Sequence, residues 1–159
     1  MEYRLEPFDR ANAPAVLSWA RTREEREAWA SITEPEPDAS IFDRWVADAD
    51  VRAFGFFEED RCIGYGEIWL DPEEGEVELA RIILDPATRG RGVGRAFVRA
   101  LVGRARDVGY GEIWLRVVPE NERAITAYAA AGFVRTTPEE ESTFNDSQPR
   151  EYVWMRVDR

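Results

Sequence analysis

The segment from Asp85 to Arg95 carries the residue types best suited to bind an anion. Its sequence, DPATRGRGVGR, holds three glycines in five positions and three arginines. Glycine lets the backbone approach a ligand without a Cβ clash, and arginine can donate two hydrogen bonds to one phosphate. A helix is expected directly after this loop, and its free N–H groups favour anions. The pattern predicts a pyrophosphate-binding loop, and the alternative is a glycine-rich turn with surface arginines. The residues of the predicted loop are Arg89, Gly90, Arg91, Gly92, Val93, Gly94 and Arg95.

The composition removes most other chemistries. The 159 residues include no histidine and no lysine, so all 21 basic residues are arginines, and Cys62 is the single cysteine. Without histidine there is no Ser-His-Asp or Cys-His arrangement and no histidine-bound metal. Without lysine there is no Schiff base and no lysine-containing phosphate loop. One cysteine allows no cysteine-rich zinc site, and with no base to activate it we expect a structural thiol. Proton transfer must therefore depend on carboxylates and hydroxyls, and no metal is expected.

Hydrophobic periodicity predicts a mixed α/β fold, and the length suits a single domain over residues 1–159. Helices are expected around Trp19, Trp29 and Trp45 and over residues 92–108 and 121–131. Residues 138–150 are polar and acidic and indicate an exposed loop. The expected order is β-α-α-β-β-β-α-β-α-β-β. Alternating or continuous apolar runs predict strands over residues 3–7, 51–57, 62–70, 76–84, 112–118, 133–136 and 152–157.

Charge and hydropathy narrow the class of partner. The net charge of −11 argues against a general nucleic-acid binder. Residues 1–80 carry a net −13 and residues 81–159 a net +2, which suggests two ligands of opposite sign, although scattered surface charge is the alternative. The charged start is unlike a signal peptide, and no apolar run approaches the length of a membrane span. We therefore expect a cytoplasmic protein that does not bind membranes.

Two segments resemble a known family. Arg89-x-x-Gly92-x-Gly94 is similar to the [QR]-x-x-G-x-[GA] motif with which the Gcn5-related N-acetyltransferases (GNAT) bind the pyrophosphate of acetyl-CoA. The segment Asn121-x-x-Ala124-x-x-x-Tyr128-x-x-x-Gly132-Phe133 resembles the second CoA-side motif of that family. The match is specific over residues 76–134 and elsewhere depends on element order alone. The resemblance implies the GNAT fold with splayed central strands and acetyl-CoA as co-substrate.

The resemblance also implies roles outside the loop. Residues matching Ile82, Ile83 and Leu84 lie beside the pantetheine arm in this family, and the residue matching Asn121 contacts the cofactor. Asn121 also suits a helix N-cap, which needs no ligand. The tyrosine that matches Tyr128 protonates the leaving thiolate in the family, whereas a helical tyrosine is otherwise most often core packing.

The proton acceptor and the acceptor site stay open. Glu78 lies 11 residues before Arg89, a spacing that resembles the base of the Gcn5-like members, although it could equally be a solvated strand carboxylate. Glu67 is the reserve base or a group that binds the charge of the substrate. Trp29 lies in the region that covers the acceptor in this family, and ordinary helix packing is its alternative.

These features predict an N-acetyltransferase that moves an acetyl group from acetyl-CoA to a primary amine by direct attack in a ternary complex. The acceptor is a small-molecule or peptide amine whose identity the sequence does not give. One alternative is a non-catalytic acyl-CoA sensor of the same fold. Another is an acyltransferase for larger acyl groups or for an oxygen acceptor. A homodimer is common in families of this kind and is a further expectation.

Overall fold

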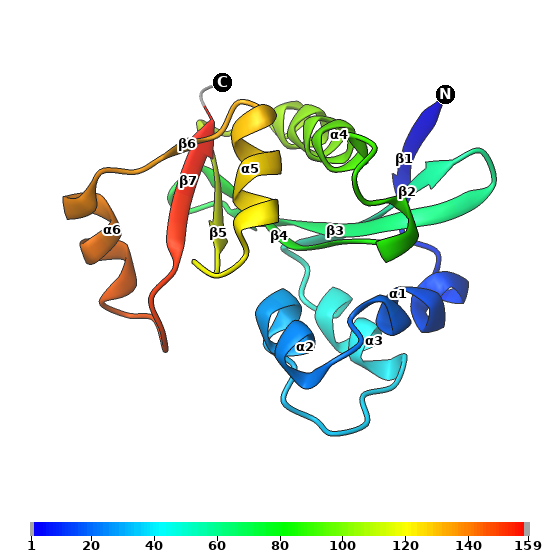
Figure 1. Ribbon diagram of the computed structural model, residues 1–159. Coiled ribbons are helices and arrows are strands. Elements are labelled where there is room, and N and C mark those ends of the chain that lie inside the picture. The colour runs from blue at the N-terminus through cyan, green and yellow to red at the C-terminus, as the bar shows by residue number, and fades with distance from the viewer. Residues whose placement is uncertain (1, 158–159) are drawn as a thin grey trace.

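Seven strands form one mixed sheet in the order β1-β2-β3-β4-β5-β7-β6, and the computed structural model describes residues 2–157 (Figure 1). Only β4 and β5 pair in parallel; the other neighbours are antiparallel. The expected mixed sheet is confirmed. The strands are β1 Tyr3–Pro7, β2 Val51–Glu58, β3 Arg61–Asp71, β4 Glu76–Leu84, β5 Glu112–Val117, β6 Val134–Arg135 and β7 Val153–Val157.

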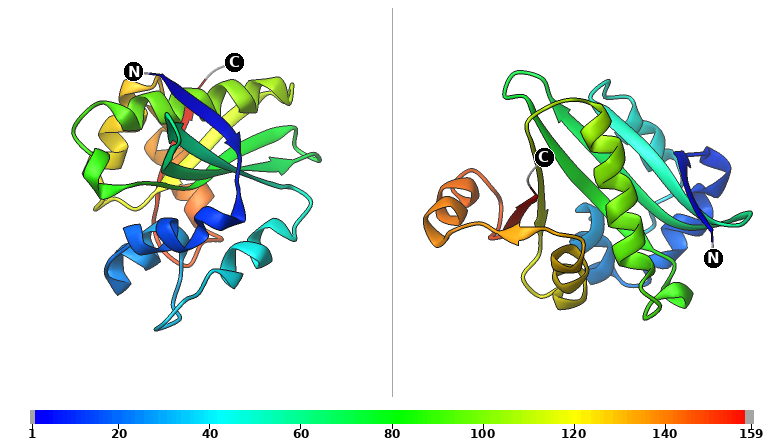
Figure 2. Two further views of the ribbon diagram at one scale, coloured as in Figure 1. Left: turned by 90° about the vertical axis from the view of Figure 1, so that its right-hand side faces the viewer. Right: turned by 90° about the horizontal axis from the view of Figure 1, so that it is seen from above.

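Helices cover both faces of this sheet. Helices α4 and α5 lie on one face, and α1, α2 and α3 lie on the other (Figures 1 and 2). No helix among residues 2–157 is long and apolar enough to cross a membrane. The helices are α1 Ala13–Trp19, α2 Arg23–Ala30, α3 Ser40–Val46, α4 Val93–Asp107, α5 Glu122–Ala130 and α6 Pro138–Asn145, with short 3₁₀ turns η1 Arg10–Asn12 and η2 Pro86–Thr88.

The three helices expected around Trp19, Trp29 and Trp45 all stand between β1 and β2, so the expected order β-α-α-β has one helix too few there. The expected loop at residues 138–150 is also wrong, because α6 occupies Pro138–Asn145. Its start is fixed by a capping box in which the Thr137 hydroxyl accepts from the Glu140 N–H and the Glu140 carboxylate accepts from the Thr137 N–H, both at 3.2 Å. Acidic residues in the first turn also suit the positive end of the helix dipole.

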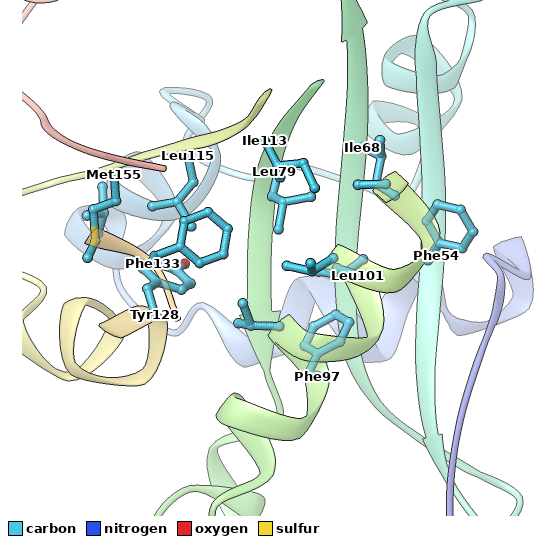
Figure 3. Close-up of a cluster of buried hydrophobic side chains, with 14 of the residues drawn as sticks. Phe54, Ile68, Leu79, Phe97, Leu101, Ile113, Leu115, Tyr128, Phe133 and Met155 are labelled. Carbon is cyan, nitrogen blue, oxygen red and sulfur yellow. The ribbon is translucent and has the colours of Figure 1, made fainter. Parts of the chain in front are cut away.

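The main core lies between the sheet and α4. Phe97 on α4 stacks on Phe56 of β2 with ring centroids 4.8 Å apart, and Leu101 follows one turn later (Figure 3). Gly66 on β3 allows this close approach, because a Cβ there would lie only 3.0 Å from Leu101 Cδ1. This packing fixes α4, and with it the loop before α4, against the sheet.

The centre of the sheet opens where β4 separates from β5. Their parallel pairing ends at Leu79 and Leu115, although β4 continues to Leu84. On its other side, β4 carries one extra residue opposite β3, and Arg81 in this bulge has a φ of +48°. The edge of β4 that faces β5 is therefore unpaired over residues 80–84. This is the splay of central strands that the resemblance implies.

Candidate active site

The glycine-arginine loop lies at the N-terminus of α4, beside the end of β4. Gly90 and Gly92 have φ values of +84° and +76°, a left-handed conformation that L-residues with side chains rarely adopt. Gly92 is also the N-cap of α4, and no side chain caps this end of the helix. The first N–H groups of α4 are thus free to bind an anion, as the sequence predicts.

The three arginines of the loop differ in their partners. Arg89 and Arg95 are exposed, and their side chains have no salt bridge or hydrogen bond within residues 2–157. The Arg91 Nη2 atom lies 3.5 Å from the carboxylate of Glu58 at the end of β2. Arg89 and Arg95 can therefore meet a phosphate directly, whereas Arg91 is already partly neutralised.

Val93 and Gly94 belong to the packing of the loop rather than to its surface. The Val93 side chain is buried in the main core, so only its backbone N–H can serve a ligand. The Cα of Gly94 faces Ala127 and Leu84, and a Cβ there would meet both at 3.5 Å. Gly94 thus brings α4, α5 and the end of β4 into close contact.

Ile82, Ile83 and Leu84 occupy the part of β4 beyond its last pair with β5. Ile83 and Leu84 pair with Tyr65 and Gly64 of β3 on one side only. The other side of this backbone segment has free N–H and C=O groups facing the splay. An extended, amide-containing arm can pair with such an edge in the manner of an added strand.

The second motif places Asn121 and Tyr128 at opposite ends of α5. The Asn121 side chain caps the helix, because its Oδ1 accepts from the Ala124 N–H at 3.2 Å. Tyr128 is 8% exposed and points from α5 toward the sheet, beside Leu115 and Phe133 (Figure 3). Its hydroxyl has no hydrogen-bond partner within the described residues. Burial raises its pKa above the usual value for tyrosine, so the hydroxyl stays protonated.

Glu78 lies on the face of β4 opposite the main core and is held by Arg116 of β5. Arg116 Nε donates to one carboxylate oxygen at 2.7 Å and Nη2 to the other at 3.0 Å. The pair is only partly exposed. A carboxylate has four lone-pair sites, so this bidentate contact orients Glu78 and leaves two sites for a proton or a water.

Glu67 has a different environment from the one expected of a substrate-binding group. Its side chain is fully buried, with 0% exposure. Arg81 Nη1 donates to Oε1 at 2.7 Å, Trp69 Nε1 donates to the same oxygen at 2.8 Å, and the Tyr65 hydroxyl donates to Oε2. Both oxygens are therefore bound by the protein itself, which argues against direct contact with a substrate.

Trp29 belongs to the same cluster. Its indole Nε1 donates to the backbone oxygen of Arg81 at 2.8 Å, and its ring meets Trp45 edge to face at 5.7 Å. The Arg81 guanidinium lies 4.2 Å from the centre of the Trp45 ring and 5.0 Å from that of Trp69. These contacts tie α2 and α3 to the β4 bulge.

The sequence reasoning missed a cavity of about 890 Å³ on the face of the sheet that carries Glu78. Trp114 of β5 and Trp154 of β7 line it, and Phe144 of α6 meets both rings within 5.5 Å. The alternation of side chains along β5 is the sequence signal for this face of the sheet. Trp114 lies between the core residues Ile113 and Leu115, so it must point to the opposite face. The cavity also depends on α6, and an exposed loop at residues 138–150 would not form it.

Cys62 is half-buried on β3, and its thiol donates to the Gly64 carbonyl at 3.6 Å. Burial raises its pKa. The thiolate is therefore scarce at neutral pH, which agrees with a structural thiol and not with a nucleophile.

Comparison with known sequences gives one family. A sequence model described as the acetyltransferase (GNAT) family matches residues 16–133. An uncharacterized protein of Mycobacterium leprae is 38% identical over 99 residues, which cover 61% of this chain and 27% of that protein. A mycothiol acetyltransferase of Rhodococcus erythropolis is 33% identical over 130 residues, covering 76% of this chain and 40% of that protein. The chain thus spans less than half the length of these two relatives.

Comparison with solved structures gives the same fold. The structure of an aminoglycoside acetyltransferase in complex with coenzyme A and kanamycin matches with a TM-score of 0.75. The match covers 99% of this chain and 95% of that chain at 21% identity. At this identity the similarity concerns the fold alone.

Proposed function

The chain belongs to the acetyltransferase (GNAT) family, and from this premise we propose that it transfers an acetyl group from acetyl-CoA to a primary amine. The observation that carries the proposal is the joining of three features in one place. An uncapped helix N-terminus with exposed arginines, an unpaired strand edge and the hydroxyl of the buried Tyr128 all surround the splay between β4 and β5. The proposed reaction is direct attack within a ternary complex, over a single domain of residues 1–159.

The residues fit acetyl-CoA as co-substrate, which supplies the acetyl group as an activated thioester. Arg89, Arg95 and the N–H groups that open α4 would hold the pyrophosphate. The free edge of β4 from Ile82 to Leu84 would pair with the pantetheine arm, and an N–H of this edge would hold the thioester oxygen. Asn121, which caps the neighbouring helix, would lie at the CoA side of the site.

Tyr128 would donate the proton that the departing sulfur needs. Its hydroxyl is protonated at physiological pH because burial disfavours the phenolate. No residue of the described chain competes for the hydroxyl. An acid in this position favours an enzyme over a non-catalytic acyl-CoA sensor of the same fold.

Glu78 would accept the amine proton, directly or through a water. A primary amine with a pKa of about 10 is protonated at pH 7, and its deprotonation costs roughly 4 kcal/mol. Arg116 fixes the Glu78 carboxylate without filling all its lone-pair sites. Among the sequence candidates, Glu78 is the better base, because Glu67 is fully buried and already bound by three donors.

The proposed acceptor is a small-molecule amine. The mycothiol and aminoglycoside acetyltransferases among the similar proteins are named for small molecules. A homodimer remains a proposal that rests on the family.

Replacement of Tyr128 by phenylalanine tests the function and the acid together. We expect kcat with acetyl-CoA and a panel of primary amines to fall about 10²- to 10³-fold, as for loss of a general acid. The acetyl-CoA KM should change little, because the ring and its packing are kept. Tyr3→Phe is the control, since Tyr3 stacks on Phe56 at the far edge of the sheet. Undiminished turnover of Tyr128→Phe would contradict the acid assignment. CoA binding by the wild type without acetylation of any amine would support the sensor instead.

A further inference from the structure

The bulge in β4 changes which residues of this strand face each layer of helices. Before the bulge, Leu79 packs in the main core, on the α4 side of the sheet. In a regular strand Ile83 would point to that same side, because alternate side chains do. Ile83 instead packs in a second apolar cluster with residues of α1 and α3, whereas Ile82 and Leu84 pack against the main core. The bulge thus shifts the alternation of side chains by one residue.

The same shift decides which backbone groups face the splay. Along a strand, the N–H and C=O groups of successive residues point alternately to the two neighbouring strands. One extra residue therefore exchanges the side to which the following N–H groups point. Residues 82–84 follow the bulge, and their side toward β5 is unpaired. The bulge therefore sets which N–H groups a pantetheine arm would meet.

Arg81, in the bulge, is held by contacts with both its backbone and its side chain. Its φ of +48° is rare for a residue with a side chain and persists only where the surrounding structure holds it. Trp29 Nε1 donates to the Arg81 backbone oxygen at 2.8 Å, and Arg81 Nη1 donates to Glu67 Oε1 at 2.7 Å. The guanidinium also lies 4.2 Å from the centre of the Trp45 ring. The peptide group and the side chain of Arg81 are thus both fixed.

Stability alone does not explain the ion pair of Glu67 and Arg81. The Glu67 side chain is 0% exposed and that of Arg81 is 20% exposed. Burial of two charges costs free energy, and apolar residues of similar volume are often at least as stabilising. Burial, and then the Glu67 charge, raise the pKa of Tyr65, so its hydroxyl keeps the proton that it donates to Glu67. With Trp69 as a further donor, Glu67 has one orientation and gives Arg81 one direction.

Resting on the proposed acetyltransferase function, we infer that Trp29, Glu67 and Arg81 are positioning residues for the co-substrate. Trp29 and Glu67 hold Arg81 in its left-handed conformation. This conformation aligns the free N–H and C=O groups of residues 82–84 with the pantetheine arm. The three residues act through the backbone of β4, and through them α2 and the sheet face opposite α4 determine how tightly the arm binds.

Two ligands separate the pantetheine arm from the rest of the cofactor. CoA carries the arm, whereas adenosine 3′-phosphate 5′-diphosphate carries the same nucleotide and phosphates without it. Calorimetry with each ligand gives two dissociation constants, and their ratio measures what the arm contributes. We expect the wild type to bind CoA about tenfold more tightly than the shorter ligand, because an added strand gains affinity from main-chain hydrogen bonds.

Trp29→Phe removes the indole N–H that holds the Arg81 carbonyl and keeps an aromatic ring in the cluster. We expect the affinity for CoA to fall about fivefold to tenfold, as for the loss of one hydrogen bond. The affinity for the shorter ligand should not change, because the loop before α4 is untouched. Trp19→Phe is the matched control, since Trp19 lies on α1 in the same apolar cluster and its indole makes no hydrogen bond within residues 2–157. It should keep the preference for CoA.

Glu67→Gln, with and without Arg81→Met, separates position from stability. Glu67→Gln should lower both the unfolding temperature and the preference for CoA. The double variant removes the whole buried charge pair, so it should unfold at a higher temperature than Glu67→Gln. Its preference for CoA should nevertheless stay low, because Arg81 no longer anchors the bulge. Recovery of the preference together with stability would show a merely structural role and overturn the inference.

The wild type distinguishes this inference from the proposed function. Equal affinity of the wild type for the two ligands, or an equal loss of affinity for both in Trp29→Phe, would also overturn the inference. Acetyl transfer by the same wild-type sample would then leave the acetyltransferase standing. A wild type that does not bind CoA would contradict the proposed function itself, and the inference with it.

Discussion

Tyr128 and Glu78, the two proposed proton-handling residues, are held in opposite ways. The Tyr128 side chain is buried among apolar groups and its hydroxyl has no partner within residues 2–157, so its environment keeps the proton on oxygen. The Glu78 carboxylate accepts two hydrogen bonds from the Arg116 guanidinium, so its position and its negative charge are fixed. One residue thus always has a proton to give, and the other always has lone pairs to receive one.

Glu78→Gln should show its loss mainly at low pH. The amide keeps one oxygen for Arg116 but cannot accept the amine proton, so we expect kcat/KM to fall about 10²-fold at pH 7. The deficit should shrink toward pH 10, since more of the amine is then already deprotonated in solution. A pH–rate profile of the variant, with Glu24→Gln as a surface control, checks this. Profiles that stay parallel to the wild type would assign Glu78 a purely structural role.

At the scale of elements, helix α4 begins with a glycine in the left-handed conformation, and this geometry places the N–H groups proposed to bind the cofactor. Gly92 has a φ of +76°, where an alanine costs roughly 1 kcal/mol, and the strain would move the N–H groups that open the helix. We therefore expect Gly92→Ala to raise the acetyl-CoA KM more than the amine KM. Gly103 on the same helix is a matched control, because a Cβ there meets nothing within 4 Å. Gly103→Ala should raise the free energy of unfolding by about 0.5–1 kcal/mol. Thermal unfolding and steady-state kinetics of both variants check this. An equal rise of the acetyl-CoA KM and the amine KM in Gly92→Ala would contradict it.

The β4 bulge depends on a side-chain cluster that reaches across three elements. Glu67 holds the Arg81 guanidinium, and Trp29 holds the Arg81 carbonyl. Glu67→Gln leaves that guanidinium without its counter-charge and should lower the free energy of unfolding by about 3 kcal/mol. Adding Arg81→Met should cost less than the sum of the single changes, since the two residues interact directly. Urea unfolding of the single and double variants measures this coupling, and strictly additive changes would show that the pair does not support the bulge.

Local patterns in the sequence predict most elements and the loop, whereas the cluster around Glu67 depends on distant contacts. The glycine and arginine spacing before residue 95 indicates an anion site because loop and helix are adjacent in the chain. By contrast, the burial of Glu67 depends on Arg81 of the neighbouring strand β4 and cannot be read from residues 61–71 alone. The polar, acidic composition of residues 138–150 does not predict helix α6, although a local signal for it exists. Thr137 and Glu140 form a capping box, with proline at the first helical position.

On the scale of the whole molecule, charge is divided between two regions of the sheet. Residues 81–159 carry the loop arginines, while the turn from β3 to β4 gathers acidic residues with few partners. The arginines agree with the anionic co-substrate proposed at the loop. The acidic residues leave the free protein with repulsion around Glu76.

Glu76→Gln should therefore stabilise the protein at neutral pH. The pKa of Glu76 is raised in the folded state, first by burial and then by neighbouring carboxylates, so its ionised form is disfavoured there. The stability of the wild type relative to the variant is lost as pH rises through this pKa and recovered in acid. For like charges opposite each other on a sheet, screened by solvent, we expect a gain of about 0.5 kcal/mol at pH 7. Thermal unfolding at pH 7 and pH 4 checks this, and a gain of equal size at both pH values would contradict it.

The unpaired edge of β4 has a consequence for the amount of folded protein. Strand β4 lacks a neighbour on its β5 side over residues 80–84, which leaves the sheet incomplete until a ligand pairs with it. Any ligand that binds this edge only in the folded state raises the free energy of unfolding by mass action. A hundredfold excess over the dissociation constant adds about 2.7 kcal/mol. The supply of co-substrate would then set how long each molecule survives proteolysis as well as how fast it works.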